Sequence, residues 1–234
     1  MIDLREIKEK ARLNSVPEST IERDYVQNWV LKHLNRVNMV LKGGTGIRKV
    51  YIGNYRFSDD LDFTLQENIS KNKLNDLLNT AIVNAKEESG INLDEKVQIE
   101  ENINGFTTDI YFRIINRGGS FAKIKLDITD SDKEKILLPI ETKEIIHPYS
   151  DNFEGKTIVY KFEEIIAEKI RALFERTRPR DLYDVWYFLN KKKISELSEI
   201  VKEKCRLKDV KLDVSYFKKR KEDFANAWTN SLSH

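Results

Sequence analysis

The residues with the clearest chemical potential are two carboxylates that alternate within an apolar run. In RFSDDLDFTL, Leu61 separates Asp60 from Asp62, and Phe63 follows. Because side chains alternate across a β-strand, both carboxylates would lie on one face and both apolar side chains on the other. Carboxylates so close repel each other unless a cation compensates them, and Mg²⁺ or Mn²⁺ with oxygen ligands is such a cation. The pattern predicts a divalent metal site at Asp60 and Asp62.

A glycine-rich segment, LKGGTG, precedes this run. Gly43, Gly44 and Gly46 permit a tight turn whose backbone N–H groups can approach a triphosphate, and a helix beginning near Thr45 would direct its positive end there. Fifteen residues separate Gly44 from Asp60, enough for a helix that returns the chain to a neighbouring strand. A two-metal site beside a triphosphate would stabilise the attacking and leaving oxygens of a phosphoryl transfer. Each pattern alone is common, but the combination predicts nucleotide chemistry.

A third carboxylate, Asp127, lies between Leu126 and Ile128 in the apolar run IKLDIT. If this run is a strand beside the one that carries Asp60, Asp127 would complete the metal site or accept the proton of an attacking hydroxyl. The alternative is an aspartate at a strand end that faces solvent. The sequence leaves both interpretations open.

Lys169 lies inside an apolar helix face. At about 100° per residue, the apolar residues of FEEIIAEKIRAL form one arc that includes Lys169. A lysine there must extend to the surface or find a partner, because an uncompensated buried charge is expensive. Asp181 and Asp184, in the next helix, are the expected partners. The set is either an ion-paired clasp or a site in which Lys169 contacts a triphosphate and the aspartates orient it. Arg171 is expected to face solvent.

Three neighbouring features are expected to be structural. Ser58 would cap the turn before the carboxylates, and Arg56 would pair locally with Asp59. The aromatic run 186–188 is expected in the core rather than as a platform for stacked bases.

Hydrophobic periodicity predicts the elements that position these residues. Helical patterns open the chain and return from residue 162, with a break at RPRD, where proline suits a first helical turn. We therefore expect an α+β protein with a sheet-bearing domain at 1–155 and a helical domain at 156–234. The expected helices are 17–37 and 72–88, and the expected strands are 39–41, 60–65, 97–99, 108–114 and 121–129.

Composition limits the other options. The 234 residues are 40% hydrophobic and 34% charged, which suits a globular protein with a real core. No apolar run is long enough to span a membrane, so a cytoplasmic location is expected. One cysteine, Cys205, and three scattered histidines give no zinc-ligand spacing, so a metal would be held by oxygen. The net charge of +2 is too small to predict nucleic-acid binding by itself.

The motifs together resemble the AbiEii/AbiGii toxin family of nucleotidyltransferase-like proteins, which includes the MenT toxins. The resemblance is carried by GGT, RFSDDLDF, EEIIAEKIRAL and PRDLYD, and it extends from IERDYVQNWVLKHL to about Leu189. It implies a DNA polymerase β-like nucleotidyltransferase fold, a mixed sheet with flanking helices, followed by a helical C-terminal part. It also implies a nucleotide loop at Gly43, Gly44 and Thr45, metal ligands at Asp60 and Asp62, an essential lysine at Lys169, and a final acidic motif at Asp181 and Asp184.

The expected activity is metal-dependent transfer of NMP from an NTP to an acceptor hydroxyl. The resemblance further implies the toxin of a type IV-like toxin–antitoxin or phage-defence pair, with the 3′ end of tRNA as acceptor and an antitoxin encoded nearby as partner. Two alternatives stay open. One is nucleotide transfer to a small molecule or a protein, and the other is a catalytically silent domain of the same fold that binds nucleotide or RNA.

Overall fold

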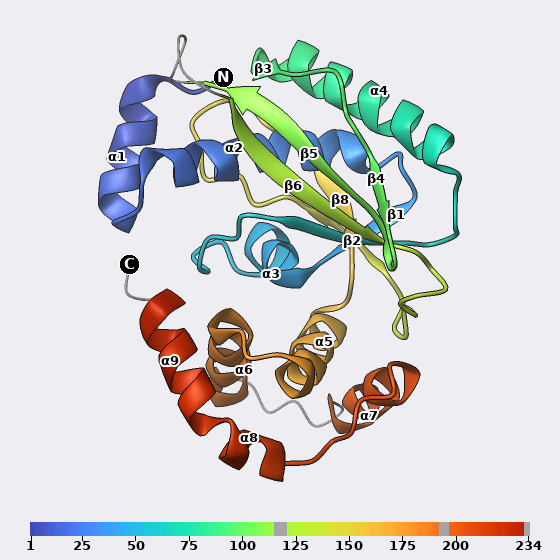
Figure 1. Ribbon diagram of the computed structural model, residues 1–234. Helices are drawn as coiled ribbons and strands as arrows, with labels where there is room; N and C mark the ends of the chain where they lie inside the picture. Colours follow the sequence, from blue (N-terminus) through green and yellow to red (C-terminus); the bar gives the residue numbers. More distant parts are fainter. Residues whose placement is uncertain (115–120, 192–196, 232–234) are drawn as a thin grey trace. The chain divides into compact units, whose positions relative to one another are not determined.

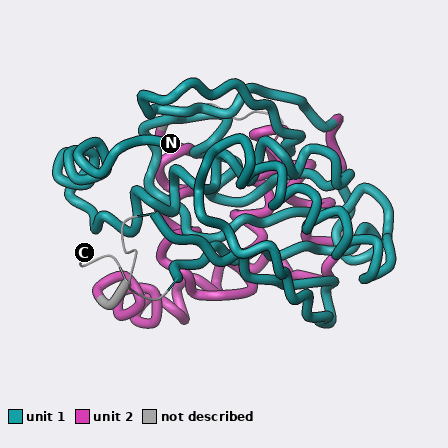
Figure 2. The backbone as a smooth tube through the Cα atoms, turned by 90° about the horizontal axis from the view of Figure 1, so that it is seen from above, with its two compact units in different colours: residues 1–136, 140–160 teal, residues 137–139, 161–234 magenta. Residues whose placement is uncertain are grey.

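A computed structural model describes residues 1–114, 121–191 and 197–231. The chain divides into two units: unit 1 consists of residues 1–136 and 140–160, and unit 2 of residues 137–139 and 161–234 (Figure 2). In the part of the chain that the structure describes, no helix combines the length and apolar character needed to cross a membrane.

Unit 1 contains a mixed β-sheet (Figure 1). In spatial order its strands are β3 (Asn92–Leu93), β5 (Gly105–Arg113), β6 (Ala122–Thr129), β2 (Leu61–Leu65), β1 (Met39–Lys42), β8 (Lys156–Val159) and β7 (Glu141–Glu144), and β4 (Glu100–Asn102) pairs with β5. The pairs β2–β6 and β1–β8 are parallel, and the other pairs are antiparallel.

The helices of unit 1 are α1 (Leu4–Asn14), α2 (Glu18–Leu34), α3 (Gly43–Gly46), the π-helical turn η1 (Ile47–Tyr51) and α4 (Lys71–Ser89). Helix α2 packs against α1, α4, β6 and β8. It is buried on several sides, so Asp24, Gln27 and Asn28 lie in the interior together with its apolar residues. Such buried polar groups need partners. The partners of Gln27 lie in the segment that leads into β2.

The central strands have two chemically different faces. On β6, Ile124, Leu126 and Ile128 are buried, whereas the residues between them are more exposed. Strand β5 repeats this alternation, with Ile110 and Phe112 buried. The other face carries polar side chains, and we call it the polar face. Asp62 and Asp127 both lie on it, because each alternates with core residues along its strand.

Unit 2 is helical in its described residues. Its helices are α5 (Phe162–Glu175), α6 (Pro179–Lys191), α7 (Leu197–Leu207), α8 (Ser215–Lys219) and α9 (Lys221–Ser231). Helix α5 packs against α6 and α7, and α6 against α9. A fully buried ion pair joins α5 to α7, because Nζ of Lys204 lies 2.8 Å from Glu164. The carboxylate of Glu164 also accepts hydrogen bonds from the backbone N–H groups of Leu137 and Leu138, which belong to this unit.

Two sequence expectations about the sheet were wrong or incomplete. Residues 97–99 are not a strand, and β4 follows them instead. Val97 and Ile99 are buried, so their apolar pattern reflects packing rather than strand pairing. Strands β7 and β8 were not predicted, although β8 lies directly beside β1. Four residues are too few for periodicity to distinguish a strand from a loop.

Candidate active site

The sheet brings two of the predicted carboxylates side by side on adjacent strands. Asp62 lies directly opposite Asp127 in the parallel β2–β6 pair, and opposite Lys42 in the antiparallel β1–β2 pair. Asp127 in turn lies opposite Thr107 of β5. Side chains that face each other on neighbouring strands are about 5 Å apart at Cβ. The strand neighbourhood on which the expectation for Asp127 depended is therefore present.

One of these carboxylates, that of Asp62, lies against the glycine pair. Gly43 has a φ of +69°, and a Cβ atom there would overlap Oδ2 of Asp62 and lie 3.2 Å from its carboxyl carbon. A Cβ atom on Gly44 would lie 3.1 Å from Nη2 of Arg56 and 3.2 Å from Oγ of Ser58. The bare backbone of this turn is thus surrounded by one carboxylate, one guanidinium and one hydroxyl. Glycine is needed for both the left-handed conformation and the close approach.

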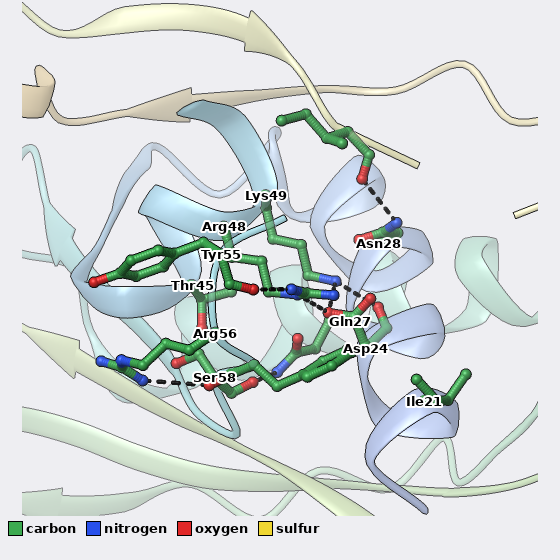
Figure 3. Close-up of polar contacts among 12 residues, drawn as sticks. Ile21, Asp24, Gln27, Asn28, Thr45, Arg48, Lys49, Tyr55, Arg56 and Ser58 are labelled. Carbon is green, nitrogen blue, oxygen red and sulfur yellow. Dashed lines mark hydrogen bonds and ion pairs between the residues drawn. The ribbon is translucent and has the colours of Figure 1, made fainter. Parts of the chain in front are cut away.

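Side chains from two elements hold the backbone that leads into β2 (Figure 3). Nε2 of Gln27 donates to the carbonyl oxygens of Ser58 and Asp59, at 3.0 Å each. Oγ1 of Thr45 donates to the carbonyl of Asp60 at 2.5 Å. Three successive carbonyls are therefore fixed, and with them the start of the strand that carries Asp62. Thr45 acts on the position of Asp60 through this bond.

A buried charge cluster anchors η1 to α2 (Figure 3). Oδ1 of Asp24 lies 2.6 Å from Nε of Arg48 and 2.7 Å from Nζ of Lys49. The hydroxyl of Tyr149 donates to Oδ2 of Asp24 at 2.7 Å, and Arg48 also donates to the carbonyl of Tyr55. Burial alone would raise the pKa of Asp24, but the two cations and their hydrogen bonds outweigh it and lower the pKa to about 2. The cluster holds the segment that directly follows the glycine turn.

Asp127 is held by two polar partners. Its Oδ2 lies 2.8 Å from Nζ of Lys125, and its Oδ1 accepts from Oγ1 of Thr107 at 3.0 Å. The hydrogen bond to Asp127 raises the pKa of Lys125, and the negative charges of Asp60 and Asp62 act in the same direction. All three carboxylates therefore stabilise the charged form of Lys125.

The donor set fits a hard divalent cation. Among the described residues, no three aspartate, glutamate, histidine or cysteine side chains already converge as a metal-binding group. Asp62 and Asp127 nevertheless share one face of adjacent strands, and the ammonium of Lys125 supplies positive charge beside them. Carboxylate oxygens are the ligands that Mg²⁺ and Mn²⁺ prefer. Asp60, one residue before β2, is the remaining carboxylate of this set.

In unit 2, Lys169 has both expected partners. Its Nζ lies 2.6 Å from Oδ2 of Asp184 and 3.4 Å from Oδ1 of Asp181. Asp181 also pairs with Arg176, whose Nε lies 2.9 Å from its Oδ2. Lys169 and both aspartates are buried. The ion pairs join α5 to α6, as the structural interpretation of Lys169 predicted. The contact between Lys169 and a phosphate stays a prediction.

Two expectations about unit 2 were wrong. Arg171 is buried and pairs with Glu175 at 3.5 Å, because α5 packs against α7 as well as α6 and so buries more than one face. The aromatic run is divided: Phe188 is buried, whereas Trp186 is 59% exposed. The side chains of consecutive residues in a helix point in different directions, so neighbouring aromatic residues can differ in burial.

The sequence interpretation missed several residues of the candidate site. Arg56 and Ser58 lie over Gly44, although they were expected to serve only local roles, and Asp59 pairs with Arg23 at 2.7 Å. The signal was present in the sequence, because polar residues recur at the alternate positions 56, 58, 60 and 62. Gln27 had no such signal, since only the packing of α2 brings it to this segment.

The described elements define a nucleotidyltransferase-type fold, as two solved structures show. MenT4, a nucleotidyltransferase toxin from Mycobacterium tuberculosis H37Rv, matches with a TM-score of 0.59 and 21% identity, over 82% of this chain and 66% of that chain. A crystal structure from H. pylori, named "putative nucleotidyltransferase", matches with a TM-score of 0.58 and 23% identity, over 92% of this chain and 83% of that one. The expected fold class is confirmed.

The family follows from the sequence. The family model "Nucleotidyl transferase AbiEii toxin, Type IV TA system" matches residues 29–233. The chain therefore belongs to the AbiEii family of nucleotidyltransferase toxins of type IV toxin–antitoxin systems, as the sequence motifs predicted. A search of curated proteins gives no match to this sequence.

Proposed function

We propose that this protein transfers NMP from an NTP to the 3′-terminal hydroxyl of an RNA, with tRNA as the leading acceptor. The observation that carries the proposal is the row formed by Asp62 and Asp127 on adjacent strands, with the bare backbone of Gly43 against Asp62. This arrangement combines oxygen ligands for a cation with a loop that a triphosphate can approach closely. The fold and the family model support this class of reaction.

In the proposed reaction the acceptor oxygen attacks the α-phosphorus of the NTP. A new O–P bond forms as the bond from the α-phosphorus to the bridging oxygen breaks, and pyrophosphate leaves. When bound at Asp60 and Asp62, Mg²⁺ or Mn²⁺ would neutralise the charge on the phosphates. Asp127 accepts the hydroxyl proton or serves as a third ligand, and the guanidinium of Arg56 at Gly44 contacts phosphate oxygens. Of the residues in these roles, Asp62 and Arg56 already lie against the glycine turn.

Further roles are proposed for unit 2 and for the cellular setting. Lys169 would neutralise charge on the leaving phosphates, with Asp181 and Asp184 orienting its ammonium. The family supports a toxin of a type IV toxin–antitoxin system. An antitoxin encoded nearby, and a setting in phage defence, are parts of the proposal. A tRNA acceptor would place the reaction in the cytoplasm.

The test is label transfer from each α-labelled NTP to total cellular RNA in the presence of Mg²⁺ or Mn²⁺. We expect an RNA-sized labelled product whose formation stops in Asp60→Ala and Asp62→Ala. Asp76→Ala is the control, because Asp76 is an exposed carboxylate of α4. Without metal, both site variants should melt at or above the wild-type temperature, because each substitution relieves repulsion between carboxylates. Full activity in both variants would remove the metal-site proposal.

The size of the labelled product separates the acceptor classes. A labelled small molecule or a labelled protein would contradict the RNA acceptor while leaving nucleotidyl transfer intact. Binding of NTP with no labelled product from any acceptor would indicate a catalytically silent domain.

A further inference from the structure

The polar face of the sheet continues beyond Asp127 as a groove. The groove has a volume of about 510 Å³, and β5 and β6 contribute Asp109, Tyr111, Lys123 and Lys125 to it. Opposite pairs in the β5–β6 ladder are Asp109 with Lys125 and Tyr111 with Lys123. These side chains share the face that carries Asp127, because they lie at alternate positions from it. The volume falls within the range of about 300–1,000 Å³ that is typical of small-ligand sites.

The face combines cations with exposed aromatic rings. The side chains of Lys123 and Lys125 are 57% and 46% exposed. Tyr111 and Phe121 are each 39% exposed, and the guanidinium carbon of Arg113 lies 4.2 Å from the centre of the Phe121 ring. Residues 121, 123, 125 and 127 follow one another at alternate positions, so the track from Phe121 to Asp127 is about 20 Å long at ~3.3 Å per residue.

The strand order decides what can occupy this track. The glycine turn follows β1, the predicted metal ligands lie at β2, and Asp127 lies on β6, on the side of β2 away from β1. In an in-line displacement the attacking oxygen and the leaving group lie on opposite sides of the reacting phosphorus. With the triphosphate at the glycine turn, the attacking hydroxyl must arrive from the β6 side. Strand β6 lies between β2 and β5 in the sheet (Figure 1), and the groove along β5 and β6 begins there.

We infer that the polar face of β5 and β6 binds the single-stranded 3′ end of the RNA acceptor. This inference rests on the proposed function. The terminal hydroxyl lies at Asp127, backbone phosphates contact Lys125 and Lys123, and a base stacks on Tyr111.

The chemistry of the face favours a single strand of RNA. Alternating cations and aromatic rings bind single strands without a sequence requirement, because phosphates meet the cations and unpaired bases stack on the rings. Acidic side chains also line the groove, among them Asp109, whose Oδ2 lies 2.7 Å from Nζ of Lys123. Asp94, Glu100 and Asp109 equal in number the three lysines of the lining, so the groove has no net formal charge. These carboxylates can accept hydrogen bonds from base amino groups or ribose hydroxyls, which a backbone-only site would not need.

Binding can be measured without metal or nucleotide. The probe is a short single-stranded RNA with a 5′ fluorophore and a free 3′ hydroxyl, followed by anisotropy. We expect Lys123→Glu and Tyr111→Ala each to raise the Kd about tenfold, the usual size of one lost phosphate contact or one lost stacked base. Lys86→Glu is the matched control, because Nζ of Lys86 lies 2.7 Å from Glu95, the same separation as in the Lys123–Asp109 pair. Lys86→Glu should leave the Kd unchanged.

Activity provides the second measurement. At saturating RNA, Lys123→Glu and Tyr111→Ala should keep kcat and the KM for NTP, while the KM for RNA rises in step with the Kd. Thermal melts of all variants verify folding, and Lys123→Gln serves if Lys123→Glu is poorly folded.

The outcomes separate this inference from the proposed function. If the wild type labels RNA and both face variants retain its Kd and KM, the acceptor binds elsewhere and only the inference fails. If RNA binds the wild type and both face variants weaken that binding, the face is confirmed as an RNA site even where no nucleotide is transferred. A wild type that binds no RNA and labels a protein or a small molecule overturns both.

Discussion

Replacing Gly43 with alanine perturbs the candidate site through a single methyl group. Two costs follow from the structure. Alanine at a φ of +69° costs about 1–2 kcal/mol in backbone conformation. The added Cβ atom also overlaps Oδ2 of Asp62, so the carboxylate or the turn must shift. A shift of about 1 Å at a reacting group costs about 10²-fold in rate, which corresponds to about 3 kcal/mol of transition-state stabilisation.

Gly90 provides the matched control for this substitution. It has a φ of +71° at the C-terminus of α4, and a Cβ atom there would meet nothing within 4 Å. Gly90→Ala therefore carries the backbone cost alone. We expect Gly43→Ala to lose at least as much free energy of unfolding as Gly90→Ala in urea melts, because it adds the overlap with Asp62 to the same backbone cost, and only Gly43→Ala to lose about 10²-fold in label transfer per folded molecule.

Two results would refute this reasoning. Wild-type transfer by Gly43→Ala would show that the contact between the turn and Asp62 is not part of the reacting arrangement. A loss of activity in Gly90→Ala equal to that in Gly43→Ala would show that the effect comes from destabilisation and not from the site.

Three further predictions concern the residues that support the site. Gln27→Leu and Asn28→Leu should each lower the free energy of unfolding by about 1–3 kcal/mol, because each removes buried hydrogen bonds. Only Gln27→Leu should raise the Mg²⁺ concentration needed for half-maximal transfer. If both variants raise it equally, the role of Gln27 is purely structural. Lys169→Met should cost about 3–5 kcal/mol, because it leaves Asp184 buried without its cation. A phosphate contact by Lys169 adds a loss of orders of magnitude in rate per folded molecule, and a normal rate would restrict it to the clasp. Folding lowers the pKa of Asp24 from 3.8 to about 2. The ionised carboxylate therefore stabilises the folded state above pH 4, and this stabilisation is lost as the pH falls towards 2. Asp24→Asn should remove about 2–3 kcal/mol of that pH dependence, and an unchanged acid slope in urea melts would contradict the assignment.

Local periodicity was enough to predict part of the candidate site. The alternation of Asp62 with Leu61 and Phe63 places its carboxylate on the face away from the core wherever the strand lies in the sheet, whereas Asp60 directly precedes β2. The position of Lys169 within an apolar arc likewise required partners, and Asp181 and Asp184 in the next helix provide them. The expected partners of Lys169 are confirmed, because that prediction depends only on the geometry of one helix and on the nearest element along the chain. The metal site at Asp60 and Asp62 stays a prediction.

Other features depend on contacts between residues far apart in sequence. Asp127 lies opposite Asp62 only because β6 pairs in parallel with β2, and a single sequence does not encode that pairing in any local pattern. Gln27 reaches the carbonyls of Ser58 and Asp59 only because α2 packs against the segment before β2. The exposure of Trp186 depends in the same way on which faces of its helix are covered. The sequence by itself therefore determined the family and the residue types of the candidate site. Tertiary packing decided which distant residues lie beside them, since strand neighbours and helix contacts are set by the free energy of the whole fold.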